Sequence, residues 1–515
     1  MTLIGRIIKA SIDLRGKIEI VPFSPFISQK RVLKKLIRKA QFTMFGEAYN
    51  FQGMLGNKNF VTKFRATVPV HDYNSIFSFC CNKSLHDQEI VCWPGKVRYF
   101  ALSSGTSGSS SKHIPVTKDM SKAIQKASLK QILSLSKYDL PFSTFEKGIL
   151  MLGGSTHLHQ QGSYFEGDLS GITASQIPFW FQHFYKPGRK ISREKDWHAK
   201  LEEITQKAKN WDIGIIVGVP AWVQLLIEKI LDHYKLKNIH ELWPNLEIYV
   251  HGGVSFEPYK KGFSKLLGKQ IYYIETYLAS EGFIAYQDEP NTRGMRLLIN
   301  NGIFYEFIPF NEDNFDADGE LKHKPKTLLL NEVVANEPYA ILLTTCSGAW
   351  RYLIGDVITF TNSEKCEIQI IGRTKHYLSL CGEHLSVDNM NRAIELVSDE
   401  LNIDIPEFAV AGIPYQSLFA HKWYVGCDTY SDSENLKKLI DEKLKILNDD
   451  YRVERKSALK EIFVEIIPTS WFYKWMELQG KIGAQNKFPR VMKNKVFQDW
   501  EKFIESQRDT IKQEA

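Results

Sequence analysis

The residues from 102 to 117, LSSGTSGSSSKHIPVT, concentrate glycine, small hydroxyl side chains and one lysine directly after an apolar run. Glycine permits positive φ angles and close backbone approach, so successive N–H groups can point into one concavity. Lys112 adds a positive charge, as a polyphosphate requires, although a flexible glycine–serine linker has a similar composition. The segment is not a Walker loop, because Lys112 is followed by His113 instead of serine or threonine. The candidate phosphate donors are Ser103, Ser104, Gly105, Thr106 and Ser107.

Two further turns rich in glycine and polar residues follow runs that are typical of strands. They are HGGVSFEPY (251–259) and YLASEG (277–282). Ligands of open α/β sheets bind beyond the carboxyl ends of the strands, so these turns could converge with the first loop. Tyr277 could stack on a flat base, and Glu281 could hold Mg²⁺ directly or through water. Taken alone, each segment is also typical of an ordinary turn at the end of a strand.

Three later segments carry an acid, an arginine and lysines. In YLIGDV (352–357), ionised Asp356 can accept two hydrogen bonds from a ribose diol. IGRTKH (371–376) places Arg373 after another strand, at a suspected junction between domains. GKIGAQNKFPR (480–490) is a glycine- and lysine-containing loop from which a lysine could reach a site in the preceding domain. Each of these is also compatible with a solvated surface turn.

The elements that would position these residues alternate between short β-rich runs and helical patterns. Buried strands are predicted at 148–154, 212–220, 246–253 and 270–277, with a helix at 221–236 between two of them. That alternation favours an α/β fold with layered sheets and helices. The segments 296–310 and 339–361 are typical of antiparallel pairs or a small β-barrel. The first hundred residues look mainly helical.

The length of 515 residues requires more than one domain. Composition shifts near 372–376, after which 434–451 reads as an amphipathic helix and 461–468 as a strand. We therefore expect a large N-terminal domain (1–372), a hinge (373–376) and a smaller mixed α+β C-terminal domain (377–515).

The charge balance and the cysteines narrow the classes of partner. The 66 basic and 59 acidic residues give a net charge of +7 and are interspersed, so nothing requires a nucleic-acid partner. The seven cysteines form no CxxC pair, so neither zinc nor a disulfide framework is suggested. No window is apolar enough to span a membrane, and the N-terminal apolar run is too short for a secretion signal. We expect a cytoplasmic protein with reduced thiols.

The order of the motifs resembles that of the acyl-adenylate-forming superfamily, which includes acyl-CoA synthetases, peptide-synthetase adenylation domains and luciferases. Within it, the chain is most similar to the GH3 family of acyl acid–amido synthetases, and the resemblance covers about residues 30–495. FRATVPVHDYNSI (64–76) resembles the family segment ahead of the loop, and the loop has the family's K-x-I-P ending. QNKFPRV resembles the family's C-terminal K-x-P-R segment. Leu278 and Leu353 depart from the usual motifs, which suggests a bacterial-type member distant from plant enzymes.

The resemblance implies a two-step reaction that uses ATP and Mg²⁺. A carboxylic acid would attack the α-phosphate and release pyrophosphate, and an amino acid's amine would then displace AMP from the acyl-adenylate. The residues carried over for nucleotide binding are the 103–107 loop, Lys112, Gly252, Gly253, Tyr277, Ser280, Asp356 and Arg373. Glu281 would hold the metal, and Lys487, or alternatively Lys481, would stabilise charge on the acyl and α-phosphate oxygens. In this superfamily the C-terminal domain rotates between the half-reactions, with Lys375 at the position that resembles the hinge residue.

Two other functions remain open at this stage. An acyl-CoA ligase shares all the adenylation residues and differs only in its acceptor. A non-catalytic nucleotide-binding protein would be expected to have lost at least one of Lys112, Glu281, Asp356 and Lys487, all of which are present. The glycine- and aromatic-rich segments 153–171 and 177–185 could line the acyl pocket. The acid, the amine and the oligomeric state are not fixed by the sequence.

Overall fold

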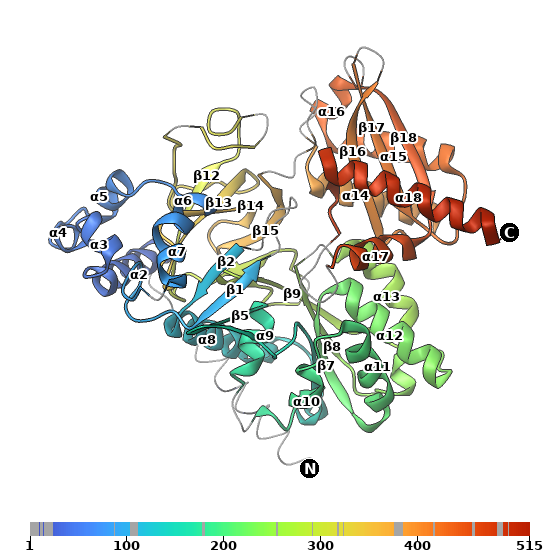
Figure 1. Ribbon diagram of the computed structural model, residues 1–515, viewed down its shortest axis with the longest axis horizontal. Coiled ribbons are helices and arrows are strands. Elements are labelled where there is room, and N and C mark those ends of the chain that lie inside the picture. The colour runs from blue at the N-terminus through green and yellow to red at the C-terminus, as the bar shows by residue number, and fades with distance from the viewer. Residues whose placement is uncertain are drawn as a thin grey trace.

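The computed structural model describes most of the chain. The described residues are 10, 14, 24–86, 88–103, 112–177, 181–253, 256–290, 292–316, 319–322, 324–374, 378, 385–415, 418–455, 459–480, 488–492 and 494–514. They form a large N-terminal domain built on two sheets and a smaller C-terminal domain built on a third (Figure 1).

An eleven-stranded sheet runs through the N-terminal domain. In spatial order its strands are β12 (Ile303–Pro309), β13 (Pro338–Thr345), β14 (Tyr352–Asn362), β15 (Glu367–Arg373), β11 (Met295–Leu297), β10 (Gly282–Tyr286), β9 (Tyr272–Ala279), β8 (Ile248–Gly252), β7 (Ile213–Gly218), β3 (Gly148–Leu152) and β6 (Tyr185–Lys186). The strands from β6 to β9 pair in parallel, and those from β9 to β12 pair antiparallel. The strands predicted in the middle of the chain are therefore present, and they give the α/β fold expected from the alternation.

The parallel half is covered on both faces, as its nearly continuous apolar strands require. One face packs on α11 (Trp197–Lys207), α12 (Pro220–Tyr234) and α13 (Lys260–Leu266), with Trp243 and Tyr249 among the fully buried side chains. The opposite face packs on the segment that follows α8 (Lys118–Ser134), through Leu135, Tyr138 and Leu140. Pro220 occupies the first turn of α12, where a missing N–H costs nothing, and Lys235 ends the helix in the left-handed conformation.

The antiparallel half confirms the expected antiparallel pairing and shows which sheet its strands join. The sequence predicts antiparallel pairs or a small β-barrel from 296–310 and 339–361. The structure adds these strands to the edge of the parallel ones, in one continuous sheet. The reason lies in β10, which pairs with β9 through the two-residue turn at Ser280 and Glu281 and so joins the two halves.

The N-terminal helices cover this antiparallel half. They are α2 (Pro25–Ala40), α3 (Met44–Ala48), α4 (Phe51–Leu55), α5 (Phe60–Thr67), α6 (Tyr73–Ile76), the π-helix η1 (Phe77–Cys81) and α7 (Asn82–Leu85). These helices agree with the expectation that the first hundred residues are mainly helical. The Ser24 side chain accepts a hydrogen bond from the Ile27 N–H at 3.3 Å and caps α2. Phe45, Phe51, Phe64 and Trp350 form an aromatic cluster between these helices and the sheet.

A four-stranded sheet carries the end of the serine-rich loop. Its order is β2 (Lys112–Val116), β1 (Tyr99–Ser103), β5 (Tyr164–Gly167) and β4 (His159–Gln161). β1 and β2 pair antiparallel, with Ser103 opposite Lys112, so the two ends of the loop lie side by side. The remaining helices of this domain are α9 (Leu169–Ser175) and α10 (Arg189–Ser192), and the short 3₁₀ turns are η2 (Leu135–Lys137), η3 (Phe142–Glu146), η5 (Ala208–Asn210), η6 (Ile239–Glu241) and η7 (Glu257–Tyr259).

The C-terminal domain is a four-stranded sheet with helices on both faces. The strand order is β18 (Leu459–Ile467), β17 (Leu418–Gly426), β16 (Glu407–Tyr415) and β19 (Val491–Met492). One face packs on α14 (Val387–Leu401), α15 (Ser433–Leu447) and α16 (Asp449–Glu454), and the other on α17 (Thr469–Leu478) and α18 (Asn494–Glu514). Figure 1 shows this domain beside α12 and α13 of the N-terminal domain.

The cysteines depart from the sequence expectation. Cys80 and Cys92 form a disulfide with their Cα atoms 5.7 Å apart, although no disulfide framework is predicted from their spacing. Packing of η1 against the loop before β1 brings the two cysteines together. Their separation of twelve residues in the sequence does not by itself predict this contact. Cys346, Cys366 and Cys427 are free and buried. In the described part of the chain, no helix is long and apolar enough to cross a membrane.

Candidate active site

Asp356 lies at the centre of the predicted ribose site and is held from two sides. The Arg373 Nε is 2.8 Å from one carboxylate oxygen, and the Tyr277 hydroxyl donates a hydrogen bond to the other. Asp356 and Arg373 stand directly opposite each other on β14 and β15, so the antiparallel register itself creates the ion pair. The Asp356 side chain is 16% exposed, and each of its oxygens retains a lone pair for a further donor. The structure thus brings together three predicted residues from three separate motifs of the sequence.

The glycine of the same motif shapes the strand next to Asp356. Gly355 has a φ of +90°, a conformation that side-chain-bearing residues rarely adopt. Its carbonyl oxygen accepts a hydrogen bond from the Thr374 N–H at 2.8 Å, and the carbonyl of Ile354 accepts one from the Arg373 guanidinium at 3.1 Å. These two bonds fix the end of β15 against β14. The first half of the expected hinge, residues 373 and 374, is therefore anchored to the strand that carries Asp356.

Glu281 lies in the turn between β9 and β10, with Ser280 before it. The side chain is buried, and this burial raises the pKa of Glu281. A hydrogen bond from its own backbone lowers the pKa, ionised Asp356 raises it, and the positive charges of Lys112 and Arg373 lower it. The pKa of Glu281 therefore depends on the charges of three other predicted residues, Lys112, Asp356 and Arg373. A buried carboxylate that is costly to ionise is a favourable ligand for a cation arriving with a polyphosphate.

Lys112 begins β2, at the end of the serine-rich loop. Its ammonium lies 5.2 Å from the centre of the Tyr73 ring, and the Tyr73 hydroxyl accepts a hydrogen bond from the His113 N–H at 2.7 Å. The His113 ring contacts Glu166 of β5 at 3.1 Å. Tyr73 and Glu166 are positioning residues that sequence reasoning missed. Tyr73 falls within the segment 64–76 that carried part of the resemblance, whereas nothing in the sequence marks Glu166.

Gly252, the last residue of β8, and Gly253, which follows it, form the predicted adenine turn. A Cβ on Gly252 would lie 2.4 Å from the Thr276 carbonyl oxygen, so only glycine allows β8 and β9 to approach here. Gly253 has a φ of +87°, which turns the chain away from the sheet. Thr276 strengthens the junction, since its hydroxyl donates to the His251 carbonyl at 2.8 Å. Tyr277 is 5% exposed: its ring lies in the hydrophobic core, and its hydroxyl donates to Asp356.

Several predicted residues lie outside the described residues. They are Ser104, Gly105, Thr106 and Ser107 of the loop, Lys375 and His376 of the hinge, and the two candidate lysines Lys481 and Lys487. Ser103 is the last residue of β1, and only its backbone is described. Arg490, which follows the second lysine in the same motif, is described and lies 2.6 Å from Glu407.

A small pocket adjoins Glu281. Its walls are largely apolar and come from η1, the loop before β1, β2 and the turn before β14. The lining includes Trp93, Tyr352 and both cysteines of the disulfide. Glu281 is the charged residue of the lining.

The described residues contain no group of three His, Cys, Asp or Glu side chains that could hold a metal ion. The two histidines 157 and 159 form no such site, and the His159 ring instead contacts Glu166 at 3.1 Å. A dedicated cage is not required for Mg²⁺, which usually keeps several waters and takes one or two carboxylates together with substrate phosphates. Glu281 beside Lys112 and Asp356 fits that pattern.

The two domains meet through a buried polar contact. The Tyr259 hydroxyl, on η7 of the N-terminal domain, donates to Glu407 at 2.6 Å. The other oxygen of Glu407 pairs with Arg490 at 2.6 Å, and the Arg490 guanidinium also lies over the Phe408 ring at 4.5 Å. Lys261 and Asp399 add an outer ion pair at 3.2 Å. Arg490, three residues after Lys487 in the chain, is therefore fixed at the domain interface.

Comparison with protein families matches nearly all of the chain. Residues 17–202 and 159–271 match the GH3 family N-terminal domain, residues 296–373 the central domain and residues 388–496 the C-terminal domain. Among curated proteins, a jasmonoyl–L-amino acid synthetase from Nicotiana attenuata is 31% identical over 33% of this chain. A putative indole-3-acetic acid-amido synthetase from Arabidopsis thaliana is 26% identical over 52% of it. These matches span only 30% and 49% of the two relatives' own lengths.

Solved structures extend the likeness to the whole fold. The GH3.15 acyl acid amido synthetase superposes with a TM-score of 0.76 at 15% identity, covering 97% of this chain and 96% of that one. A 2-hydroxyisobutyryl-CoA ligase in complex with an acyl-adenylate superposes with a TM-score of 0.59 at 14% identity, covering 93% of this chain and 91% of that one. The fold is thus that of adenylate-forming enzymes, as the motif order suggested. The bacterial-type assignment stays a prediction.

Proposed function

The chain belongs to the GH3 family, and from that membership and the site geometry we propose that it is an ATP-dependent acyl acid–amido synthetase. It activates a carboxylic acid as an acyl-adenylate and transfers the acyl group to the amine of an amino acid. One observation carries the proposal: Asp356 contacts both Arg373 and Tyr277, and the charges of Asp356, Arg373 and Lys112 all act on Glu281. The relatives named above are a jasmonoyl–L-amino acid synthetase and a putative indole-3-acetic acid-amido synthetase. Their names support an amino acid as the acceptor.

The chemistry explains why a nucleotide is needed. A carboxylate resists an amine because its charge repels nucleophiles and its oxide is a poor leaving group. Attack of the carboxylate oxygen on the α-phosphate forms the acyl–phosphate bond and breaks the bond to pyrophosphate. The amine then attacks the acyl carbon, AMP leaves with the bonding electron pair, and the amine loses its proton.

Each described residue has one task in this scheme. Asp356 accepts hydrogen bonds from the two ribose hydroxyls, and Arg373 and Tyr277 keep its carboxylate in place. The turn at Gly252 and Gly253 lies along the adenine, together with Ser280. Lys112 and the loop that begins at Ser103 bind the β- and γ-phosphates, because the loop's two ends are held side by side.

Magnesium and a C-terminal lysine complete the proposal. Mg²⁺ bound at Glu281 would offset the charge of the departing pyrophosphate. Lys487, or alternatively Lys481, would stabilise charge on the acyl and α-phosphate oxygens. We take residues 1–372 as the adenylating domain, 373–376 as the hinge and 377–515 as the mobile domain. We also propose that the enzyme works in the cytoplasm on small molecules.

Pyrophosphate exchange tests the first half-reaction. We expect labelled pyrophosphate to enter ATP only when a suitable carboxylic acid from an aliphatic and aryl panel is present. Lys112→Ala should lower the exchange rate by about 10²–10³-fold, the usual cost of losing one charge-stabilising donor. The nearby Lys118→Ala is the matched control, because it removes a lysine of α8 that lies outside the site. Absence of exchange with every acid would leave only a nucleotide-binding role.

Single-turnover trials with preformed acyl-adenylate test the second half-reaction. Amide formation with an amino acid is expected, and thioester formation with CoA is not. Reaction with CoA alone would make the protein an acyl-CoA ligase, whose fold is also similar.

A further inference from the structure

We propose that the Cys80–Cys92 disulfide is a thiol–disulfide exchange site that controls the pocket beside Glu281 and, through β14, the nucleotide site. Both cysteines line the same pocket as Glu281. The co-reactant is a small thiol or dithiol able to enter that pocket. The proposal uses the acid-activation chemistry proposed above only as one of its readouts.

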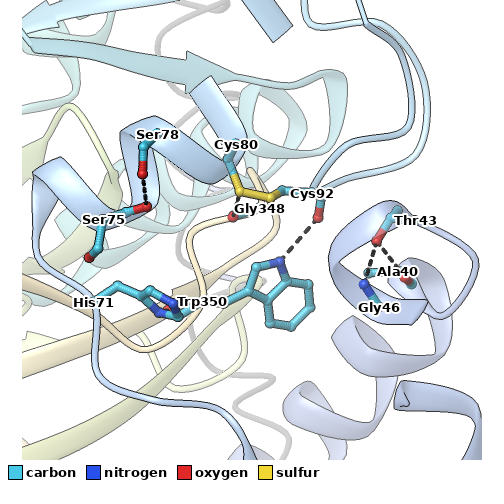
Figure 2. The surroundings of a disulfide bond; sticks show 10 residues. All are labelled: Ala40, Thr43, Gly46, His71, Ser75, Ser78, Cys80, Cys92, Gly348 and Trp350. Carbon is cyan, nitrogen blue, oxygen red and sulfur yellow. Dashed lines mark hydrogen bonds between the residues drawn. A yellow bond between two sulfur atoms is a disulfide. The ribbon is translucent and has the colours of Figure 1, made fainter. Parts of the chain in front are cut away.

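The disulfide is packed against the turn that precedes β14 (Figure 2). The Trp350 indole N–H donates to the Cys92 carbonyl oxygen at 3.1 Å. The Cys80 sulfur lies 4.0 Å from the Gly348 carbonyl oxygen. Both cysteines are nearly fully buried against the aromatic cluster. The bond thus joins three segments: η1, the loop before β1 and the turn before β14.

This junction has no spare volume on its inner side. Gly348 has a φ of +88°, and a Cβ placed on it would lie 2.9 Å from the Cys92 Cβ. Two bonded sulfur atoms stand about 2.05 Å apart, whereas unbonded heavy atoms prefer about 3.5–4 Å. Reduction therefore requires the sulfurs to separate by about 1.5–2 Å. The separating sulfur atoms must therefore move into the pocket beside Glu281 or push the turn at Gly348.

The Gly348 turn is connected to Asp356 by a short and rigid path. The His71 ring donates to the Trp350 carbonyl at 2.8 Å, and the His71 N–H donates to the Arg351 carbonyl at 2.9 Å. The Leu353 N–H in turn donates to the His71 carbonyl at 2.9 Å. These bonds hold the start of β14 against His71, and Asp356 follows three residues after Leu353. Movement of the turn is thus transmitted to the strand that carries Asp356.

Thiol exchange at this bond is balanced. A thiolate attacks one sulfur, the bond between Cys80 and Cys92 breaks, and the released cysteine thiolate takes up a proton. A second thiol then attacks the mixed disulfide and frees the other cysteine. The protein gains two electrons and two protons, and two small thiols become one small disulfide.

The test compares the oxidised and reduced full-length protein. Alkylation in denaturant followed by mass measurement should detect two additional thiols after treatment with a small dithiol. We expect acid-dependent pyrophosphate exchange to fall by about 10–100-fold on reduction, since a shift of about 1 Å near a reacting group can cost 10²-fold. Reoxidation should restore the rate. Hydrogen exchange in residues 343–356 should become faster in the reduced protein, and this readout does not depend on the enzyme activity.

Variants separate this site from a general thiol effect. The double variant Cys80→Ser/Cys92→Ser should behave like the reduced protein and ignore the dithiol. Cys427→Ser changes a buried free cysteine of the C-terminal domain and should remain sensitive. Equal exchange rates within about twofold and unchanged hydrogen exchange in the two redox states would overturn the proposal. If no acid supports exchange but hydrogen exchange still responds to the dithiol, the proposed function fails while the redox site stands.

Discussion

Replacement of Asp356 by alanine should weaken nucleotide binding far more than it weakens the fold. Asp356 is fixed before any ligand arrives, because the Arg373 Nε at 2.8 Å and the Tyr277 hydroxyl hold its two oxygens. Two ribose hydroxyls would add two hydrogen bonds to a charged acceptor, each worth about 1.5–3 kcal/mol. Their loss is about 3–6 kcal/mol, or roughly 10²–10⁴-fold in the dissociation constant. The Tyr277 hydroxyl would also lose its acceptor, which should lower the stability by about 1–3 kcal/mol.

The measurement is ATP affinity by calorimetry, paired with denaturant unfolding of the same samples. Asp288→Ala is the matched control. Asp288 is also a buried aspartate paired with an arginine, since the Arg296 Nε lies 2.9 Å away, and Lys137 lies 3.1 Å away. Glu281 precedes β10, whereas Asp288 lies after the other end of that strand. Its replacement should lower stability without changing ATP affinity.

Two outcomes would refute this reasoning. Unchanged ATP affinity in Asp356→Ala would remove the ribose assignment. An equal loss of affinity in Asp288→Ala would show that general destabilisation, and not contact with the nucleotide, explains the effect.

Three further predictions concern the sheet and the domain interface. Burial, together with the nearby charge of Glu257, raises the pKa of Glu275 from 4.5 to about 7. The wild-type protein should therefore lose up to about 3 kcal/mol of stability as the pH rises from 4.5 to 7. Glu275→Gln should abolish this loss in denaturant unfolding, and an unchanged pH profile of the variant would contradict the prediction. Gly252→Ala places a Cβ 2.4 Å from a carbonyl oxygen and should weaken ATP binding at least about tenfold by calorimetry, whereas Gly56→Ala, in open space, should not. Glu407→Gln leaves Arg490 without its ion partner at the domain interface and should lower the free energy of unfolding by about 3–5 kcal/mol. A decrease below about 1 kcal/mol would mean that the pair behaves like an exposed ion pair.

Much of the fold was predictable because local pattern and burial agree. The strands at 148–154, 212–220, 246–253 and 270–277 are short apolar runs that end in glycine or polar turns, and each corresponds to a strand of the structure. The helix at 221–236 has the same spacing of apolar residues that its packing on the sheet requires. The antiparallel pairing of 296–310 and 339–361 was predictable from the sequence pattern, but the sheet edge that these strands join was not.

The candidate site was predictable as a set of residue types and less so as a set of contacts. Asp356 and Arg373 were chosen for their chemistry, and the register of β14 and β15 turned them into an ion pair. Tyr277 was expected to stack on a base, yet its hydroxyl holds Asp356, because β9 brings the ring edge to β14. Glu166 carries no sequence signal, since its role depends on two histidines from other strands.

The sequence by itself determined the family, the alternation of strands and helices and the order of the motifs, because these depend on residue type and short-range spacing. Only the tertiary structure decided which side chains meet. The Cys80–Cys92 bond, the apolar pocket beside Glu281 and the Tyr259–Glu407–Arg490 contact between domains all join segments by packing. Their partners are set by the burial of apolar surface over the whole chain, and no local spacing encodes that outcome.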